Sequence, residues 1–465
     1  MRVLISKELS LIVTTTNVSK AGTTSLNLSA SRKLYESYSK VTPGGVQSNF
    51  RFEEPHPLYF RRARGSRMWD IDGNEYTDYV VGYGSIILGH NDPKVRESVT
   101  ECLETGLTSG IETELSYYVC ESLCNMIPTA ESVRVAVTGT EAVMHAIMLA
   151  RAYTGKKRIV KVEGTYHGWY DPIAVSHYPP IDRAGPSSSP IPVPNTAGLD
   201  SSAVESTLMV QFNDVNGLLQ VVNQHKNEIA ALIIEPVCFN MGAVMPKPEY
   251  LQTVREITSS NDIPLIFDEV ITGFRLAPGG AQEYFHISPD MSTFGKALGN
   301  GYPISALVGR SDILEMSKPG GNVAYSGTYS GNQISLAAAK ATLDILKTGN
   351  VQRHLHTQTD LLISTVERLA SDSHIPVRVQ GVGGQFQIYF SKDEVKDYRS
   401  ATQINAKMYK DIRNDMKEKG LLFHPHPLFH HGVTGAHTSE DLDHLIQTIA
   451  SFLSNQSRAS PKSNA

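Results

Sequence analysis

The sequence predicts an α/β protein whose main sheet is largely parallel and covered by helices on both faces. Two strand-length apolar segments, Ala230–Val237 and Ile263–Val270, flank a helix, Glu249–Ser259. Continuously apolar strands that alternate with helices are typical of a parallel sheet buried on both faces. Polar residues follow several strand segments directly, and in such sheets ligand groups gather beyond the carboxyl ends of the strands. The 465 residues are enough for about two domains.

The other elements follow from local patterns in chain order. Alternating apolar residues on both sides of Asp72-Gly73 predict a hairpin over residues 68–79. Apolar spacing predicts further helices and strands. They are helices Leu34–Ser39, Pro93–Leu107 and Thr113–Met126, strand Val133–Val137, a helix beginning near Glu141, strand Arg158–Val162, helix Ile334–Lys347, strands Val377–Val379 and Phe386–Phe390, and helices near 402–419 and 439–454. Residues 179–202 contain six prolines and predict a long loop, either an active-site cover or an exposed excursion.

The composition is that of an ordinary globular protein, with 40% hydrophobic and 19% charged residues. A net charge of −5 gives no general argument for binding nucleic acid or membranes. No apolar run approaches the roughly 20 residues of a membrane span. Four cysteines without metal-ligand spacing favour a reducing compartment, so we expect a cytoplasmic protein and no metal. Residues 1–33 read as a flexible tail, with organelle targeting as the alternative.

Lys296 lies between glycines, before a Gly-x-Gly-x-Pro turn that ends at Pro303. Glycines 295, 299 and 301 would allow positive φ angles and a close approach to a flat ligand. Lys296 is then a fixed amine nucleophile, which a carbonyl cofactor such as pyridoxal phosphate needs for a Schiff base. The alternative is a solvent-exposed turn lysine.

Four other positions offer matching chemistry, each with a plainer alternative. Thr138-Gly139-Thr140 lies where a strand passes into a helix and could cradle a phosphate or simply cap the helix. Asp268 ends an apolar strand and could pair with a pyridinium nitrogen or with an arginine. Tyr166 could stack on a planar ring or pack in the core. His167, the next residue, could be a catalytic or a structural histidine. Thr328 could reach a phosphate or cap a helix.

Arg51 could hold a substrate carboxylate through its two-pronged guanidinium, or form a surface salt bridge.

Taken together and in this order, these residues resemble the class III (subgroup II) pyridoxal-phosphate aminotransferases of fold type I. Within the class, the sequence looks closest to the glutamate-1-semialdehyde aminomutase branch. The matching motifs are Pro-Gly-Gly-Val-x-Ser-x-x-Arg (43–51), Gly-Thr-Glu-Ala (139–142), Glu-Gly-x-Tyr-His-Gly (163–168), Asp-Glu-Val-x-Thr-Gly-Phe-Arg (268–275), Gly-Gly-Ala-Gln (279–282), Gly-Lys-x-x-Gly-x-Gly-x-Pro (295–303), Gly-Thr-x-Ser-Gly-Asn (327–332) and Ala-His-Thr-x-Glu-Asp (436–441).

The resemblance implies a large domain with a mainly parallel seven-stranded sheet, over residues 101–330, and a smaller α+β domain, over 331–465. Residues 34–100 would pack with the small domain. The implied catalytic residues are Lys296, Asp268 and Tyr166. The implied cofactor-binding residues are Gly139, Thr140, Tyr166, Glu235, Asp268, Val270, Lys296 and Thr328, with Thr328 contributed across a homodimer interface. Ser48, Arg51 and Tyr83 match substrate-binding positions of the branch.

Three departures from the aminomutase pattern concern the substrate. Trp169 stands where aminomutases usually have histidine, Tyr83 where they have tryptophan, and Phe429 where they have a glutamate. The histidines around Phe429 are interleaved with prolines, which indicates loop packing. A lost carboxylate and added aromatic bulk disfavour a small diamino intermediate and favour an apolar or aromatic β- or D-amino acid.

The sequence therefore predicts an aminotransferase that acts on an amino acid, with an oxo acid as acceptor, through a Lys296 Schiff base and two half-reactions. The alternatives are glutamate-1-semialdehyde 2,1-aminomutase activity and racemisation with the same cofactor. A non-catalytic protein that binds a phosphate ligand is the remaining hypothesis, and it requires Lys296 to have no chemical role.

Overall fold

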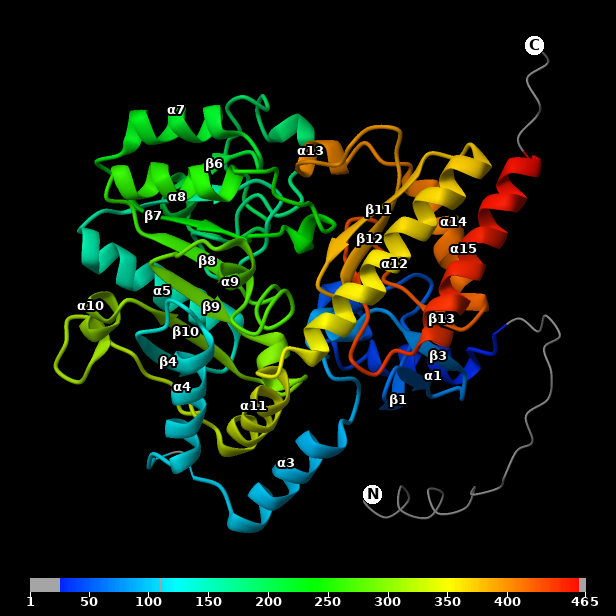
Figure 1. Ribbon diagram of the computed structural model, residues 1–465, viewed down its shortest axis with the longest axis horizontal. Helices are drawn as coiled ribbons and strands as arrows, with labels where there is room; N and C mark the ends of the chain where they lie inside the picture. Colours follow the sequence, from blue (N-terminus) through cyan, green and yellow to red (C-terminus); the bar gives the residue numbers. More distant parts are fainter. Residues whose placement is uncertain (1–25, 109, 460–465) are drawn as a thin grey trace.

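The computed structural model describes residues 26–108 and 110–459, which form two lobes (Figure 1). The larger lobe is built on a seven-stranded sheet with the order β4-β10-β9-β8-β7-β5-β6. Strand β10 runs antiparallel to β4 and β9, and the other pairings are parallel. The strands are β4 (Ser132–Ala136), β5 (Arg158–Val162), β6 (Thr207–Val210), β7 (Ile229–Ile234), β8 (Leu265–Glu269), β9 (Met291–Phe294) and β10 (Ser305–Gly309). The predicted fold class is confirmed.

Strand β7 shows why both faces of this sheet are covered. Leu232 and Ile234 belong to one apolar cluster with residues of α7 (Val215–His225) and α8 (Tyr250–Ser260). Ala231 and Ile233 belong to a second cluster with residues of α5 (Gly139–Thr154). Because successive side chains of a strand point to opposite faces, a strand packed on both sides must be apolar throughout.

The helices at the lower edge of the large lobe in Figure 1 are α3 (Pro93–Thr105), α4 (Glu114–Met126) and α11 (Gln333–Leu346). Helix α11 packs against α3 and α4, and the chain passes into the second lobe with α12 (Asn350–Ser373). The short helices of this lobe are α6 (Ser201–Glu205), α9 (Ala281–Phe285) and α10 (Ser311–Leu314), with 3-10 turns η3 (Ile181–Arg183), η4 (Phe239–Met241), η5 (Lys296–Gly299) and η6 (Glu315–Ser317). The predicted domain boundaries themselves stay a proposal.

The smaller lobe is built from segments near both ends of the chain. One sheet has the order β1-β2-β3-β13 and the other β11-β12-β14. Their strands are β1 (Phe60–Arg64), β2 (Arg67–Asp70), β3 (Glu75–Asp78), β11 (Val377–Val382), β12 (Gln385–Phe390), β13 (Leu421–Leu422) and β14 (His431–Gly432). The smaller lobe also contains these further helices and 3-10 turns: α1 (Ser29–Tyr38), α2 (Val81–Gly84), α13 (Tyr398–Ala401), α14 (Ala406–Glu418), α15 (Ser439–Ala459), η1 (Pro43–Gly45) and η2 (Asn49–Arg51).

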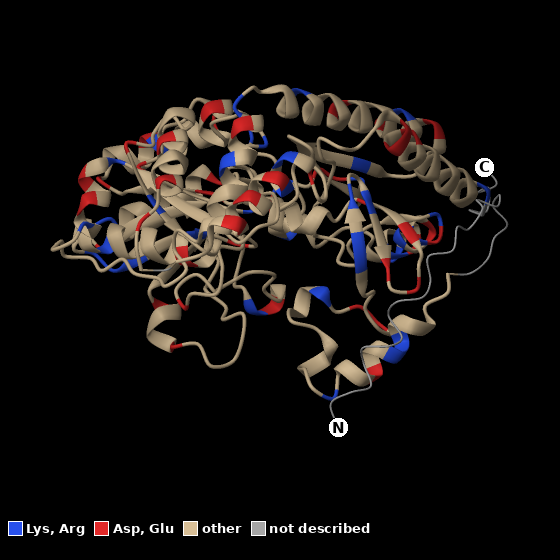
Figure 2. Cartoon of the chain, turned by 90° about the horizontal axis from the view of Figure 1, so that it is seen from below, with Lys and Arg blue, Asp and Glu red and all other residues tan. Residues whose placement is uncertain are grey.

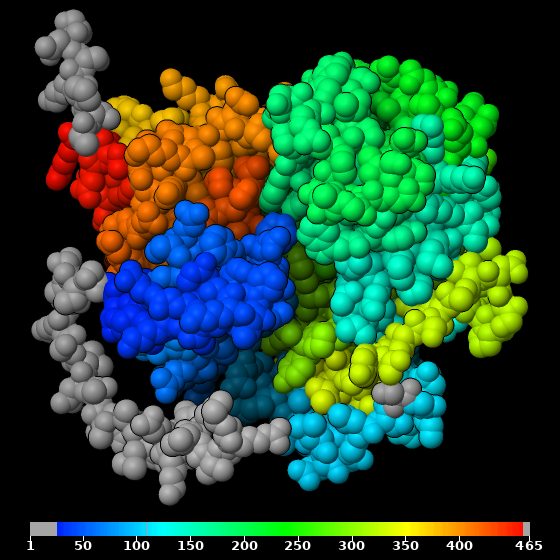
Figure 3. Space-filling model, turned by 180° about the vertical axis from the view of Figure 1, so that it is seen from behind, coloured from blue at the N-terminus to red at the C-terminus, as the bar shows by residue number. Residues whose placement is uncertain are grey.

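Figure 3 shows the N-terminal residues in blue against C-terminal residues in orange and red. The surface is hollowed between the blue segment and the green large lobe.

Most predicted elements are present, including the hairpin of β2 and β3. Helix α1 begins at Ser29, five residues before the predicted start, because Asp72 accepts hydrogen bonds from the backbone of Ala30 and Ser31. The remaining part of the predicted tail, residues 1–25, lies outside the described residues. Strands β6, β9 and β10 and helices α7 and α12 were not predicted.

Charged residues of both signs are interspersed over the two lobes, apart from a basic stretch on β1 (Figure 2). Among the residues that the structure describes, no helix is long and apolar enough to cross a membrane.

Candidate active site

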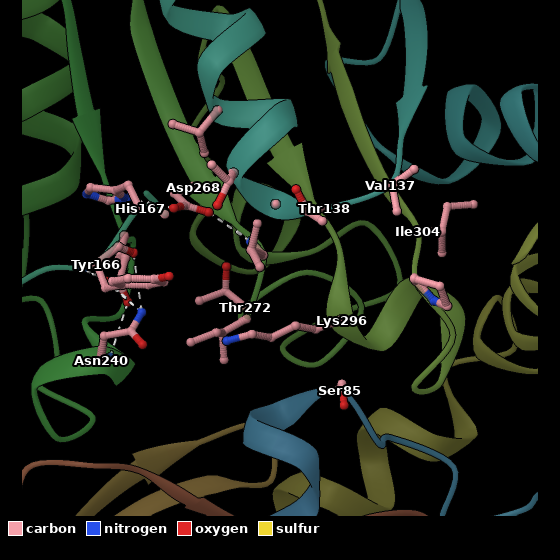
Figure 4. Close-up of a pocket in the computed structure, with 18 of the residues that line it drawn as sticks. Ser85, Val137, Thr138, Tyr166, His167, Asn240, Asp268, Thr272, Lys296 and Ile304 are labelled. Carbon is pink, nitrogen blue, oxygen red and sulfur yellow. Dashed lines mark hydrogen bonds and ion pairs between the residues drawn. The ribbon is translucent and has the colours of Figure 1, made fainter. Parts of the chain in front are cut away.

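A cavity of about 330 Å³ lies at the edge of the large sheet, where four strand ends and the start of α5 meet. Seven of the predicted site residues line it. They are Gly139, Thr140, Tyr166, Glu235, Asp268, Val270 and Lys296. They come from five separate segments, because the carboxyl ends of parallel strands open on the same edge. Figure 4 shows the Lys296 side chain extending across the cavity, with Asp268 and His167 beyond it.

Lys296 follows β9 and has a φ of 44°, in the left-handed region that a residue with a Cβ rarely adopts. Such strain is kept where the surroundings impose it, often at functional sites. Of the three glycines predicted to supply positive φ, only Gly301 does so, and that expectation is corrected for Gly295 and Gly299. At Gly299 the requirement is space, since a Cβ there would lie 2.7 Å from Ile304 Cγ2.

The environment of Lys296 suits an amine nucleophile. Burial lowers the pKa of its ammonium group to about 8, although the carboxylates of Glu235 and Asp268 oppose that shift. A lysine with a lowered pKa holds more of its free amine at neutral pH than an exposed lysine does. Lys296 is therefore not the exposed turn lysine of the alternative reading.

Asp268 is buried and is oriented by three donors. His167 contributes Nδ1 at 2.6 Å from Oδ2, while Thr293 Oγ1 and the Val270 backbone N each lie 3.1 Å from Oδ1. The partners of the Asp268 carboxylate are therefore these three donors, and not the arginine of the alternative prediction. A carboxylate fixed by three donors at a cavity wall is prepared to accept a further hydrogen bond from a ligand.

Tyr166 and Glu235 are joined through the main chain. The Glu235 carboxylate accepts hydrogen bonds from the Tyr166 backbone N at 3.1 Å and from Asn240 Nδ2 at 3.0 Å. Burial raises the pKa of the Tyr166 phenol to about 12. The Tyr166 hydroxyl therefore stays protonated at neutral pH, so the ring can stack and donate but does not act as a base.

The start of α5 offers backbone donors to the cavity. Thr138 caps the helix by accepting from the Glu141 N, and Glu141 accepts from the Thr138 N in return. This capping box leaves the first-turn N–H groups of Gly139 and Thr140, which line the cavity, for a ligand. An anion such as phosphate is favoured there by these donors and by the helix dipole.

We expect Gly139→Ala to weaken cofactor binding by about tenfold, because overpacking costs roughly 1–3 kcal/mol. A Cβ at this position would lie 3.1 Å from Val270 Cγ2 and press on a residue of the cavity wall. Titration of the apoprotein with pyridoxal phosphate, followed by absorbance, measures the loss. Gly435→Ala, where a Cβ meets only ordinary contacts of 3.5 Å or more, is the control and should bind normally. Equal affinity of the two variants would contradict this role for Gly139.

The cavity residues fit pyridoxal phosphate. The amine of Lys296, the oriented carboxylate of Asp268, the donors at the start of α5 and the ring of Tyr166 match its aldehyde, ring nitrogen, phosphate and aromatic face, respectively. The absence of a side chain at Gly139 leaves room for a phosphate against Val270.

The predicted substrate residues lie next to this cavity, not in it. Arg51 is exposed and, with Tyr83, lines a neighbouring cavity of about 380 Å³. Ser48 is half-buried and precedes η2. Burial raises the pKa of Tyr83, and the nearby charge of Arg51 opposes the shift.

Four rings, which we call the aromatic wall, pack together beside the neighbouring cavity: Phe50, Tyr83, His424 and Phe429. The Phe429 ring lies 5.1 Å from that of Tyr83, 4.3 Å from His424 and 6.3 Å from Phe50, between ring centroids. Phe50 in turn lies edge-on to Tyr166 at 6.3 Å. The aromatic wall therefore reaches Tyr166 of the first cavity through Phe50.

Thr328 is exposed and lies apart, on a third cavity of about 460 Å³ that Ser116 and Tyr325 also line. A contribution of Thr328 to a neighbouring subunit therefore stays a prediction.

Three residues that contact the predicted ones were not singled out by their patterns. Asn240 lines the cavity and binds Glu235, Thr293 binds Asp268, and Phe50 begins the aromatic wall. An asparagine in a loop or a threonine in a strand carries no local signal of such a role, and the Thr293–Asp268 contact also joins two separate strands.

A family model described as Aminotransferase class-III matches residues 50–452. A curated relative, glutamate-1-semialdehyde 2,1-aminomutase of Archaeoglobus fulgidus, is 38% identical over 428 residues, which cover 92% of this chain and 100% of that protein.

Two solved structures are also similar. An omega-transaminase from Sphaerobacter thermophilus superposes with a TM-score of 0.87 at 31% identity, over 92% of this chain and 98% of that one. A β-phenylalanine aminotransferase from Variovorax paradoxus does so with a TM-score of 0.83 at 26% identity, over 94% of this chain and 96% of that one.

Proposed function

Because this chain belongs to the class III aminotransferases, enzymes of fold type I that use pyridoxal 5′-phosphate, we propose that it moves an amino group between carbon atoms of small amino and oxo compounds. The observation that carries the proposal is the meeting of Lys296, Asp268 and the start of α5 in one cavity. Family membership also argues against a protein that merely binds a phosphate ligand.

We assign the catalytic work to Lys296, Asp268 and Tyr166. When bound, the cofactor supplies an aldehyde that links to amines and a ring that withdraws electrons from bonds at the substrate carbon. With the cofactor bound, Lys296 Nζ would hold its aldehyde group and would be the amine that takes and returns the proton of the substrate carbon. Asp268, held in place by His167 and Thr293, would accept a hydrogen bond from the ring nitrogen and keep that nitrogen protonated. Tyr166 and Val270, which both line the cavity, would hold the cofactor ring between them.

For the substrate, the curated relatives favour the intramolecular reaction. At 38% identity over almost their whole length, relatives named as glutamate-1-semialdehyde 2,1-aminomutases support that activity better than the intermolecular transfer predicted as the main reading. Ser48 and Arg51 would then hold the substrate carboxylate at the mouth of the cavity.

The second candidate is a transaminase for an apolar or aromatic amino acid, including β- or D-amino acids. The observation in its favour is the aromatic wall, where Phe429 is buried at the position of the aminomutase glutamate. A wall without a carboxylate lacks the group that would attract an amine-bearing intermediate. The transaminases among the structural neighbours support the same reading.

One experiment separates the candidates. Purified protein loaded with pyridoxal phosphate is given glutamate-1-semialdehyde alone, and separately β-phenylalanine with pyruvate or 2-oxoglutarate. Isomerisation without an oxo acid identifies the aminomutase, and amino transfer that requires the oxo acid identifies the transaminase. Deuterium exchange at the substrate carbon without either product would point to racemisation. No reaction with any donor, and no lysine-linked cofactor, would refute the proposed activity.

We expect Phe429→Glu to shift the substrate preference. A carboxylate beside Tyr83 and His424 should raise turnover of glutamate-1-semialdehyde and lower that of β-phenylalanine, each by about tenfold, which corresponds to roughly 1.4 kcal/mol. The ratio of the two kcat/KM values measures the shift. Leu219→Glu, on the outer surface of α7, adds the same charge away from the cavity and should leave the ratio unchanged. A constant ratio in both variants would exclude Phe429 as a determinant.

The remaining expectations concern assembly and location. We propose a homodimer in which Thr328 reaches the phosphate of the neighbouring subunit, supported by its exposed position beside Tyr329 and the apolar residue Ile111. We also propose a cytoplasmic location, supported by the four cysteines, all of which are free.

A further inference from the structure

Strand β5 carries a fully buried lysine, Lys161, among buried apolar residues. Its Nζ donates to the Thr165 carbonyl oxygen at 2.6 Å and lies 3.5 Å from the Val162 carbonyl oxygen. The nearest acid in sequence, Glu163, is already bound by Arg399 at 2.9 Å. Within residues 26–108 and 110–459, Lys161 has no ion-pair partner, so its ammonium group is held by main-chain carbonyls.

The Thr165 carbonyl belongs to the same peptide group as the Tyr166 N–H. Lys161 binds the oxygen of that group, and Glu235 accepts from its N–H at 3.1 Å. A buried cation and a buried anion therefore hold the two ends of one peptide plane, which we call the Thr165–Tyr166 peptide. The orientation of this plane sets the direction in which the Tyr166 side chain leaves the main chain.

We propose that Lys161 is a positioning residue for the cofactor, which acts by fixing the Thr165–Tyr166 peptide and with it the Tyr166 ring and the His167 imidazole. The inference rests on the proposed function, since it concerns the residues that would cover the cofactor ring and orient Asp268. Lys161 itself does not line the cavity.

A purely structural role explains this lysine poorly. Burial lowers its pKa to about 7, although the carboxylates of Glu235 and Glu163 oppose that shift, which shows how unfavourable the interior is for its charge. An apolar side chain of similar length would avoid this cost, and replacing buried charges by apolar residues is often neutral or stabilising. An apolar residue could not, however, donate the hydrogen bond to the Thr165 carbonyl oxygen.

The test is Lys161→Met, which keeps the length of the side chain and removes the donor. We expect the apoprotein to melt within a few degrees of the unaltered protein, while its affinity for pyridoxal phosphate falls by about tenfold, as for a lost hydrogen bond from a charged donor. The visible circular dichroism of the bound cofactor, which reports the ring's orientation against Tyr166, should change as well. Lys161→Gln, which retains an uncharged donor, should recover part of both losses.

Thr258→Val on α8 is the control for a buried polar group removed away from the cavity, and it should alter neither readout. Lower melting temperature of Lys161→Met with unchanged affinity and dichroism would show that Lys161 is only structural. If Lys161→Met does not fold, the same measurements on Lys161→Gln decide. Failure of the unaltered protein to bind the cofactor through Lys296 would instead refute the proposed function, so the two failures are distinguishable.

Discussion

Lys296→Ala should fold and lose amino transfer by at least about ten thousand-fold, the upper range for removal of a general acid–base, with the covalent attachment lost in addition. Lys296 Nζ is the one amine among the cavity-lining side chains, so its loss removes both the nucleophile and the proton carrier. The protein purified with pyridoxal phosphate should lack the yellow adduct that borohydride reduces onto a lysine.

The folded state is checked by the far-ultraviolet spectrum and the melting temperature, which should stay close to those of the unaltered protein. Added methylamine provides the second check, because a small amine that enters the cavity should restore a measurable part of the turnover. Substantial activity of Lys296→Ala without methylamine would disprove the assignment.

Asp268→Asn should lower kcat by about a hundredfold to a thousandfold, comparable to the loss of one preorganised electrostatic group. The amide keeps the size of the carboxylate and removes the negative charge that would hold the ring nitrogen protonated. His167 and Thr293, which now donate to two carboxylate oxygens, would also face an NH₂ group. Single-turnover kinetics separate this effect on chemistry from an effect on binding.

The matched control is Asp290→Asn, a carboxylate that precedes β9 and binds Arg255 and Arg310 far from the cavity. We expect Asp290→Asn to lower the melting temperature with little change in kcat. Asp268→Asn should instead lower kcat with little change in the melting temperature. The assignment of Asp268 fails if both variants are equally active.

The sequence predicts the site better than it predicts the contacts within it. Asp268 lies near the end of β8 and Glu235 directly follows β7, so their place at the sheet edge follows from topology. The bond between His167 and Asp268 joins residues 101 positions apart, and no local pattern carries that information. The positive φ of Lys296 was likewise assigned to neighbouring glycines, because propensity alone favours glycine there.

Helix α12 shows why some elements of the fold were missed. Three of its six buried positions are polar, namely Gln352, Gln358 and Thr359, so the apolar period of the helix is interrupted. Strand β10 was missed because its antiparallel place between β4 and β9 is decided by distant partners.

The parallel pairing of β3 with β13 has a consequence for biosynthesis. Thr77 and Asp78 pair with Leu421 and Leu422, so β3 leaves the ribosome long before its partner exists. At about 5–20 residues per second, the delay is roughly 20–70 s. Throughout that interval Tyr79, which is fully buried in the finished protein, lacks the Phe423 and His437 rings that pack against it. The nascent N-terminal segment therefore exposes the Tyr79 ring until these residues are made, and a chain that stops before residue 421 leaves β3 without this partner strand.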